Sequence, residues 1–195
     1  MQTSELNSPN RLSERLLHMA DTQWRGEGRE HLPGAERSET STYEVTLSIG
    51  SCVRMSVEGE AGSERICMQY SSQTRCLASQ ELTRQETGYW IFDLASNVFC
   101  KSISMPCSRV ILAGGAFTYS PENGLVMVAS AKAGDNKYGI CSEPTQDAAI
   151  PILSFTSNMM QSLTTFNFSE MIVKRHHGRE ICVTNEATLQ MRSAI

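Results

Sequence analysis

Alternation of hydrophobic and polar side chains is the main pattern along this chain of 195 residues. It is clearest from Thr42 to Ile49, where Tyr43, Val45 and Leu47 alternate with polar residues. A period of two places the two sets of side chains on opposite faces of a β-strand. About nine or ten such segments follow one another at the spacing of an all-β barrel or sandwich. We therefore expect an all-β fold.

The stretch from Glu86 to Gly115 predicts three short strands joined by tight turns. The strands are expected at Glu86 to Asp93, Val98 to Met105 and Arg109 to Ala113. Strands this short, joined this tightly, are antiparallel neighbours. We expect them to form the middle of a single antiparallel up-and-down β-barrel.

The N-terminal region predicts one short helix before the barrel. Residues 1–8 are expected to be disordered, and a single barrel domain is expected to span residues 9–195. Leu12, Leu16 and Met19 recur at helical spacing after Ser8 and Pro9, which favour a helix start. This amphipathic helix would plug or flank an open end of the barrel.

Three further boundaries are predicted from turn residues and from gaps in the alternation. Gly50-Ser51 is expected to turn the chain, so that Cys52 to Val57 forms a separate strand. Gly134 to Ile150 is expected to be rich in loops. The segment from Asn185 to Met191 is expected to be a short closing strand.

Composition and charge narrow the class of protein. The net charge is −4 and the basic residues are dispersed, so we expect no nucleic-acid partner. The seven cysteines are odd in number and none stand at C-x-x-C spacing, which argues against a disulfide framework or a structural zinc site. No apolar run suits a signal peptide or a membrane span. We therefore expect a soluble protein in the cytoplasm.

Four segments carry a resemblance to a known family. They are Trp24-Arg25-Gly26-Glu27-Gly28, Glu86-Thr87-Gly88-Tyr89-Trp90, Ser104-Met105-Pro106 with Leu112-Ala113-Gly114-Gly115, and Thr184-Asn185-Glu186-Ala187-Thr188-Leu189. In this order they resemble the opening W-x-G-x-G strand, the E/Q-T-G-Y motif, the I-P-x-x-x-x-L-A-G-G segment and the closing T-D-x-N-T-L strand of the nitrobindin-like, heme-binding β-barrel proteins. The resemblance runs from about Leu16 to Met191.

This resemblance implies a lipocalin-like or fatty-acid-binding-protein-like barrel with an internal apolar pocket. In the family the pocket can hold ferric heme through one histidine, and some members act on nitric oxide or peroxynitrite. Val183 occupies the position of that ligand histidine, and Arg84 occupies the position of a second pocket histidine. Neither side chain is an ordinary iron ligand. We expect no cofactor, although heme stays possible through the resemblance.

The strand that contains the E-T-G-Y motif supplies most of the candidate site. Alternation places Arg84, Glu86, Gly88, Trp90 and Phe92 on one face, which would look into the barrel. Arg84 would pair with Glu86, receive a ligand carboxylate or phosphate as a bidentate fork, or reach out of the barrel mouth. The predicted pocket wall consists of Trp24, Arg84, Glu86, Trp90, Phe92 and Val183.

The histidines and cysteines suggest no catalytic or metal site. His176 and His177 precede Gly178 in a predicted hairpin tip, where they would form a solvated turn or a metal or heme ligand displaced along the strand. Cys182 adjoins Val183, but alternation points it to the other face. The cysteines are expected to be buried and inert, with thiolate ligation of heme or redox sensing as the alternatives.

Three functions fit these observations. The first is non-catalytic binding of a small, mostly apolar ligand, with Arg84 as an anchor for a carboxylate. The second is a heme protein with nitric-oxide or peroxynitrite chemistry that uses a different iron ligand. The third is a ligand-free relic scaffold that acts through its surface, with a homodimer as one form. The pocket hypothesis fails if side chains fill the barrel.

Overall fold

The structure is a computed structural model that describes residues 9–33, 39–56, 64–106, 109–120, 122–142 and 150–194. Residues 1–8, which the sequence predicts to be disordered, lie outside these ranges. The elements are α1 (Pro9–Leu17), β1 (Thr22–Leu32), β2 (Glu39–Ser56), β3 (Glu64–Cys76), β4 (Leu82–Asp93), β5 (Val98–Met105), β6 (Arg109–Ser120), β7 (Gly124–Lys132), β8 (Ile140–Ser142), β9 (Ile152–Gln161), β10 (Thr165–His176) and β11 (Arg179–Ala194).

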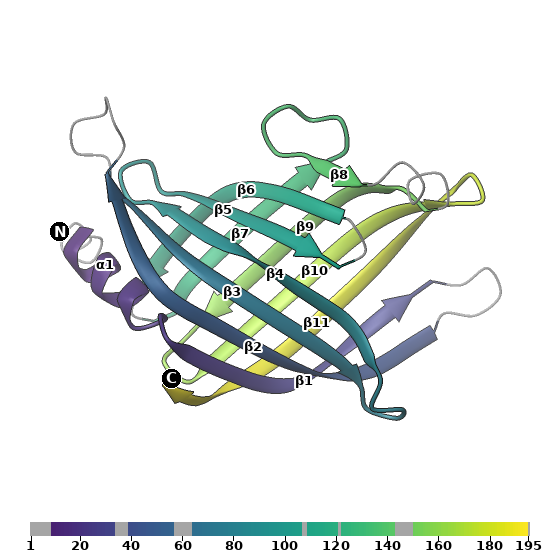
Figure 1. The fold of residues 1–195 in the computed structure, drawn as a ribbon, viewed down its shortest axis with the longest axis horizontal. Coiled ribbons are helices and arrows are strands. Elements are labelled where there is room, and N and C mark those ends of the chain that lie inside the picture. Colours follow the sequence, from purple (N-terminus) through teal and green to yellow (C-terminus); the bar gives the residue numbers. More distant parts are fainter. Residues whose placement is uncertain are drawn as a thin grey trace.

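The described strands form a closed antiparallel barrel (Figure 1). Ten of them pair in the order β5-β4-β3-β2-β1-β11-β10-β9-β7-β6, and a β5–β6 pairing closes the ring. The short strand β8 pairs with β6 over Arg109 to Ile111, beyond the part of β6 that pairs with β7. The predicted all-β barrel with a short N-terminal helix is confirmed. Its topology is up-and-down, because each of the ten barrel strands pairs with the barrel strands that precede and follow it along the chain.

Three predicted boundaries are wrong. Gly50 and Ser51 do not end a strand, because β2 continues to Ser56 and only shifts register against β3 between Ile49 and Cys52. A bulge of this kind absorbs extra residues without reversing the chain. The closing strand is not short, since β11 runs from Arg179 to Ala194, and the strand expected to end at Ala113 continues as β6 to Ser120. The described part of Gly134 to Ile150 is rich in turns as predicted, apart from the three-residue strand β8. Val57 lies outside the described residues.

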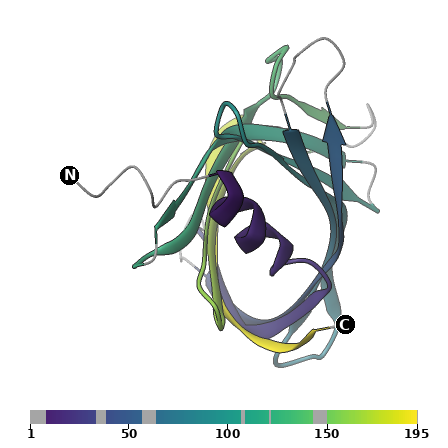
Figure 2. The same cartoon turned by 90° about the vertical axis from the view of Figure 1, so that its left-hand side faces the viewer.

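Helix α1 lies across one end of the barrel (Figure 2). Leu12 and Leu16 of the helix, and Met19 just after it, are buried in the core, so the apolar stripe read from the sequence faces the barrel. Thr22 donates a hydrogen bond to the carbonyl oxygen of Met19, and Trp24 donates its indole N–H to Thr22. The helix therefore plugs this end. No helix in the described ranges is long and apolar enough to cross a membrane.

The half of the barrel next to α1 is packed with apolar side chains. The ring of Phe92 lies 5.0 Å from that of Phe99 and 5.2 Å from that of Phe117, measured between centroids. All three rings are almost fully buried, together with Trp24. Aromatic pairs at these separations add to the stabilisation that comes from apolar burial.

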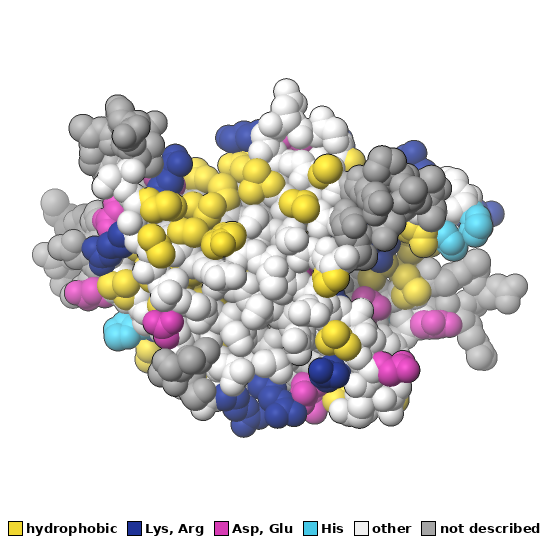
Figure 3. Space-filling model, viewed as in Figure 1, with side chains coloured by type: hydrophobic (Ala, Val, Ile, Leu, Met, Phe, Trp, Pro, Cys, Tyr) yellow, Lys and Arg dark blue, Asp and Glu magenta, His cyan; other side chains and the backbone are white. Residues whose placement is uncertain are grey.

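The outer wall of the barrel is not uniformly polar. Figure 3 shows hydrophobic side chains gathered on one part of the surface. The exposed large hydrophobic residues of the barrel include Val53, Tyr89 and Leu112. Strand register places Val53, Cys67, Ile91 and Cys100 side by side across β2 to β5. These outward positions form an apolar row over four strands.

Candidate functional site

A cavity of about 290 Å³ lies inside the barrel, in the half away from α1. Its deep part is lined by apolar and aromatic residues, among them Leu47, Tyr70, Trp90 and Phe166. Hydroxyl, amide and charged side chains line the part nearer the mouth, and the uncharged ones include Ser72, Thr74, Thr83 and Asn185. The barrel therefore combines a solid half with a hollow half.

A stack of aromatic rings forms the floor of the cavity. The ring of Trp90 lies nearly parallel to that of Phe166, with 5.7 Å between centroids, and 5.2 Å from that of Tyr70 on β3. Phe166 in turn lies 5.9 Å from Trp24. These residues come from β1, β3, β4 and β10, so the stack crosses the barrel and separates the cavity from the packed half.

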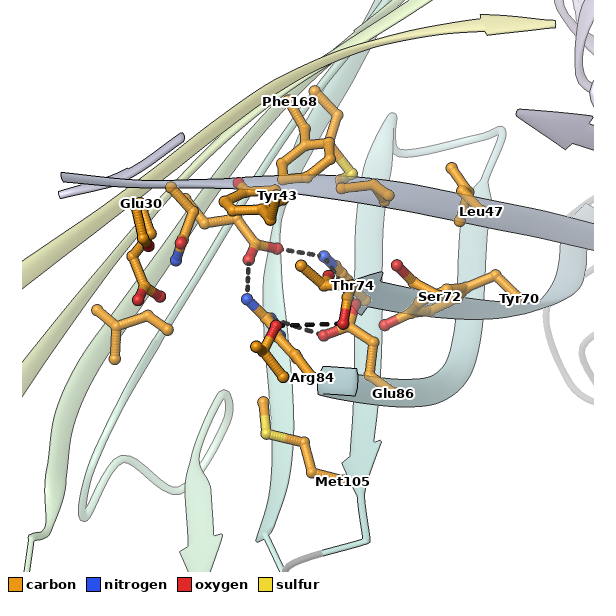
Figure 4. Close-up of a pocket in the computed structure, with 18 of the residues that line it drawn as sticks. Glu30, Tyr43, Leu47, Tyr70, Ser72, Thr74, Arg84, Glu86, Met105 and Phe168 are labelled. Atoms are coloured by element: carbon orange, nitrogen blue, oxygen red, sulfur yellow. Dashed lines mark hydrogen bonds and ion pairs between the residues drawn. The ribbon is translucent and has the colours of Figure 1, made fainter. Parts of the chain in front are cut away.

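Four ionised side chains from three strands meet at the cavity wall (Figure 4). Arg84 directs one nitrogen to Glu86 at 2.6 Å and the other to Glu170 at 2.9 Å. Lys101 contacts Glu170 at 2.7 Å and lies 3.9 Å from Glu86. We call Arg84, Glu86, Lys101 and Glu170 the ion quartet. Two cations and two carboxylates cancel in it.

The quartet keeps its charges although burial opposes them. Burial by itself would raise the pKa of Glu170, but Arg84 and Lys101 outweigh it and hold this pKa at about 2, against an ordinary value of 4.5. Burial likewise acts to lower the pKa of Arg84, and the carboxylates of Glu170 and Glu86 raise it above its ordinary value. Only 4% of the Glu170 side chain and 24% of the Arg84 side chain are exposed. Each charge is therefore tolerated because of its partners.

Two tyrosines line the cavity as neutral phenols. Burial, and then the negative charge of Glu170, raises the pKa of Tyr43. Burial, and then the charge of Glu86, raises that of Tyr70. Tyr70 donates its hydroxyl hydrogen to the carbonyl oxygen of Ser102 at 3.1 Å. The Lys101 ammonium lies 5.7 Å from the centre of the Tyr70 ring, within the range of a cation–π contact.

The structure divides the six predicted pocket residues into two groups. Arg84, Glu86 and Trp90 line the cavity, whereas Trp24, Phe92 and Val183 are buried outside its lining. The predicted common face of β4 is confirmed by its burial pattern. Because this face runs the length of the barrel, its Phe92 end lies in the packed half and its Arg84 end in the hollow half. Trp24 belongs to the aromatic stack of the floor through its contact with Phe166, but it does not itself line the cavity.

Sequence reasoning missed half of the ion quartet. Lys101 and Glu170 stand in β5 and β10 at positions whose neighbours in the alternation, such as Phe99 and Ile172, are buried. A charged residue on an otherwise apolar face is the signal that would have found them. The sequence does not show which strands face one another across the interior. The contact between Glu170 and Arg84 could therefore not be predicted from it.

No histidine lines the cavity in the described part of the chain. His176 and His177 lie at the tip of the β10–β11 hairpin, where His177 and Gly178 both have positive φ angles, as a two-residue hairpin turn requires. The described residues contain no group of three or more His, Cys, Asp or Glu that would hold a metal. Possible iron ligands in the lining are Tyr43, Tyr70, Cys76, Met105 and Met159. The lining thus lacks the histidine through which heme is held in the family that the sequence resembles.

Comparison with known proteins supports the fold. No protein-family model and no curated protein sequence matches this chain. The crystal structure of Rv2717c from M. tuberculosis is similar over 92% of this chain and 96% of that chain, with a TM-score of 0.65 and 16% identity. The S-type phycobiliprotein lyase CPES from Guillardia theta aligns over the full length of both chains, with a TM-score of 0.46 and 7% identity. The first of these similarities fits a lipocalin-like barrel fold.

Proposed function

We propose that this protein binds a small, mostly apolar molecule inside the barrel and performs no chemistry on it. The observation that carries the proposal is the cavity of about 290 Å³ above the aromatic floor. Concave sites of about 300 Å³ or more, largely apolar and with a few polar groups, are typical of small-molecule binding. A scaffold without a ligand would be expected to fill this space with side chains, as its other half does.

Heme is a poorer candidate for the occupant. The family resemblance suggested it, but Val183 stands in place of the ligand histidine and lies outside the cavity lining. Burial and nearby carboxylates raise the pKa values of Tyr43 and Tyr70, which disfavours the phenolate that would bind ferric iron. The cavity is also smaller than a porphyrin macrocycle requires. The donors present do not fit heme held by histidine, and a hemin titration of the wild type and Val183→His tests this.

The binding proposal is tested with N-phenyl-1-naphthylamine, an uncharged dye whose fluorescence rises in apolar surroundings. We expect the dye to bind with a stoichiometry of one. Ser72→Phe, which adds a ring to the inner wall of β3, should abolish binding. The matched control is Ser71→Phe, because Ser71 is the neighbouring residue and points outward. Binding that survives Ser72→Phe, or no binding by the wild type, would contradict the proposal.

A second candidate function rests on the apolar outer row. Contiguous exposed apolar surface often marks a protein interface, so the barrel would also act as a scaffold through this face, as a homodimer. Sedimentation velocity of the wild type and of Val53→Glu, in the apolar row, distinguishes the cases. Val53 is 55% exposed, so the substitution should leave folding intact and dissociate such a dimer. A wild-type monomer at all concentrations would remove the homodimer.

A further inference from the structure

We propose that the ligand of the cavity is uncharged and joins a small apolar or aromatic body to atoms that accept hydrogen bonds. This inference rests on the proposed binding function and narrows its ligand class. It replaces the carboxylate ligand that Arg84 alone suggested. Three observations carry it: the neutrality of the ion quartet, the occupied fork of Arg84 and the uncharged polar groups around them.

The ion quartet leaves no net charge for a ligand to neutralise. Arg84 and Lys101 are balanced by Glu86 and Glu170, and three of the four contacts between them are 2.9 Å or shorter. Of the four side chains only that of Arg84 is more than 7% exposed. An ionic ligand would add an unbalanced charge to this poorly hydrated region, which is costly.

Both terminal nitrogens of Arg84 are also already paired with glutamates. One terminal nitrogen serves Glu86, as Figure 4 shows, and the other serves Glu170. A carboxylate ligand that used both terminal nitrogens as a bidentate fork would have to displace one of these glutamates. The displaced glutamate would then be a buried carboxylate with a weakened partner, so the exchange gains little. Anion carriers, in contrast, need an arginine whose fork is open.

Away from the mouth, the polar groups that stay available in the lining carry no charge. Trp90 and Asn185 are buried, and the indole N–H of Trp90 and the amide nitrogen of Asn185 have no hydrogen-bond partner within the described ranges. Both are donors, so a carbonyl, ether or hydroxyl oxygen on a ligand would satisfy them. Ser72 and Thr74 add hydroxyl groups on the adjoining wall.

Charged residues at the mouth do not change this assignment. Glu30, Arg109 and Lys174 line the outer part of the cavity, and all three are half-buried rather than buried. Arg109 donates to the carbonyl oxygen of Ile150 at 3.2 Å. The Arg109 Nε is buried and has no hydrogen-bond partner within the described ranges, although the residue as a whole is partly exposed. Because all three side chains are partly exposed, solvent weakens the action of their charges on a ligand relative to that of the ion quartet.

The test uses three naphthalene probes of nearly equal size at pH 7. These are naphthalene-2-carboxamide, which is neutral, naphthalene-2-carboxylate, an anion, and naphthalen-2-ylmethylammonium, a cation. Each displaces bound N-phenyl-1-naphthylamine from the wild type. We expect the amide to bind at least about 10-fold more tightly than either ion, because only the ions leave an unbalanced charge in the site.

The variant Glu86→Gln should reverse the order of the neutral and anionic probes. It removes one carboxylate charge while it keeps the shape of the side chain, so the ion quartet gains a net positive charge. The carboxylate should then bind more tightly than the amide, by about 10-fold. Glu44→Gln is the matched control, because it changes the total charge equally at an outer ion pair. That control should keep the wild-type order.

The outcomes separate this inference from the proposed function. If the dye binds but the carboxylate displaces it as well as the amide does, the uncharged-ligand inference is overturned and the binding function stands. If the dye itself does not bind, the binding function fails and the inference fails with it. The wild-type comparison decides the inference even where Glu86→Gln does not fold.

Discussion

The two halves of the barrel are built on the same strands but filled in different ways. Near α1 the inner face of β4 carries Phe92 and Trp90, whereas towards the mouth it carries Glu86 and Arg84. Strand register sets Ile66 and Met68 of β3 beside the first pair, and Ser72 and Thr74 beside the second. One half is therefore a solid apolar core, and the other is a cavity with a polar wall.

This difference shows how one sheet provides both a stabilising apolar core and a cavity for a ligand. The packed half is closed by a helix, and its aromatic rings bury enough apolar surface to hold the strands together. The hollow half forgoes that packing and contains buried charges that are stable only together. We infer that apolar burial in the solid half offsets the destabilisation caused by the cavity and the buried charges of the hollow half. Each of the following predictions tests that division.

Phe92→Ala should give the largest loss of stability. The ring is fully buried and contacts Phe99 and Phe117, so its removal leaves a cavity in the solid half. We expect the free energy of unfolding to fall by about 4 kcal/mol, measured by urea denaturation. Tyr89→Ala, on the outward face of the same strand, should change it by less than about 1 kcal/mol. Equal losses would mean that the inner face is not the core.

Glu170→Gln should give the second largest loss. It leaves the two cations of the ion quartet with one carboxylate, and breaking a buried pair in this way costs about 3 kcal/mol. Urea denaturation at pH 7 measures the loss. Lys101→Met in the same chain restores a neutral cluster, so the double variant should be more stable than Glu170→Gln alone. If Glu170→Gln unfolds at the same urea concentration as the wild type, the quartet is not coupled as described.

Acid should weaken the hollow half before it affects the apolar core. The pKa of Glu170 is about 2 in the folded chain and 4.5 ordinarily, so the unfolded chain takes up a proton first as the pH falls. The stability due to this group is complete above pH 4.5 and is lost as the pH falls towards 2. Between about pH 5 and pH 3 the loss amounts to about 2 kcal/mol.

The difference between wild type and Glu170→Gln isolates this contribution, since other carboxyl groups titrate in both chains. We expect urea denaturation series of the two chains to converge as the pH falls through this range. Parallel series would show that Glu170 does not hold a lowered pKa.

Glu44→Gln should give the smallest effect. Arg25 and Glu44 form an ion pair at 2.6 Å on the outer wall, but 54% of the arginine side chain is exposed. Solvent screens such a pair, and we expect a change of less than about 0.5 kcal/mol in the free energy of unfolding. The loss of unfolding free energy in Glu170→Gln, divided by the loss in Glu44→Gln, measures how much burial increases the cost of removing one carboxylate from an ion pair. A loss as large as that of Glu170→Gln would contradict the distinction between the inner and outer walls.

Local patterns in the sequence predicted the barrel and one wall of its site. Alternation on β4 assigned Arg84, Glu86, Trp90 and Phe92 to one inward face, because a strand repeats every two residues. The helix was equally local, since its apolar residues recur at helical spacing. The bulge after Ile49 escaped prediction, because a glycine followed by a serine suits a bulge as well as a turn.

The sequence by itself determined which side chains face inward, and therefore that charged residues would enter an apolar barrel. Only the tertiary structure decided that Glu170 and Lys101 meet Arg84 and Glu86, and that Phe92 lies in the solid half while Arg84 lies in the hollow half. Contacts across the interior depend on closure of the whole ring and on strand register, which are non-local. An arginine that seemed open to a carboxylate ligand is for that reason already paired.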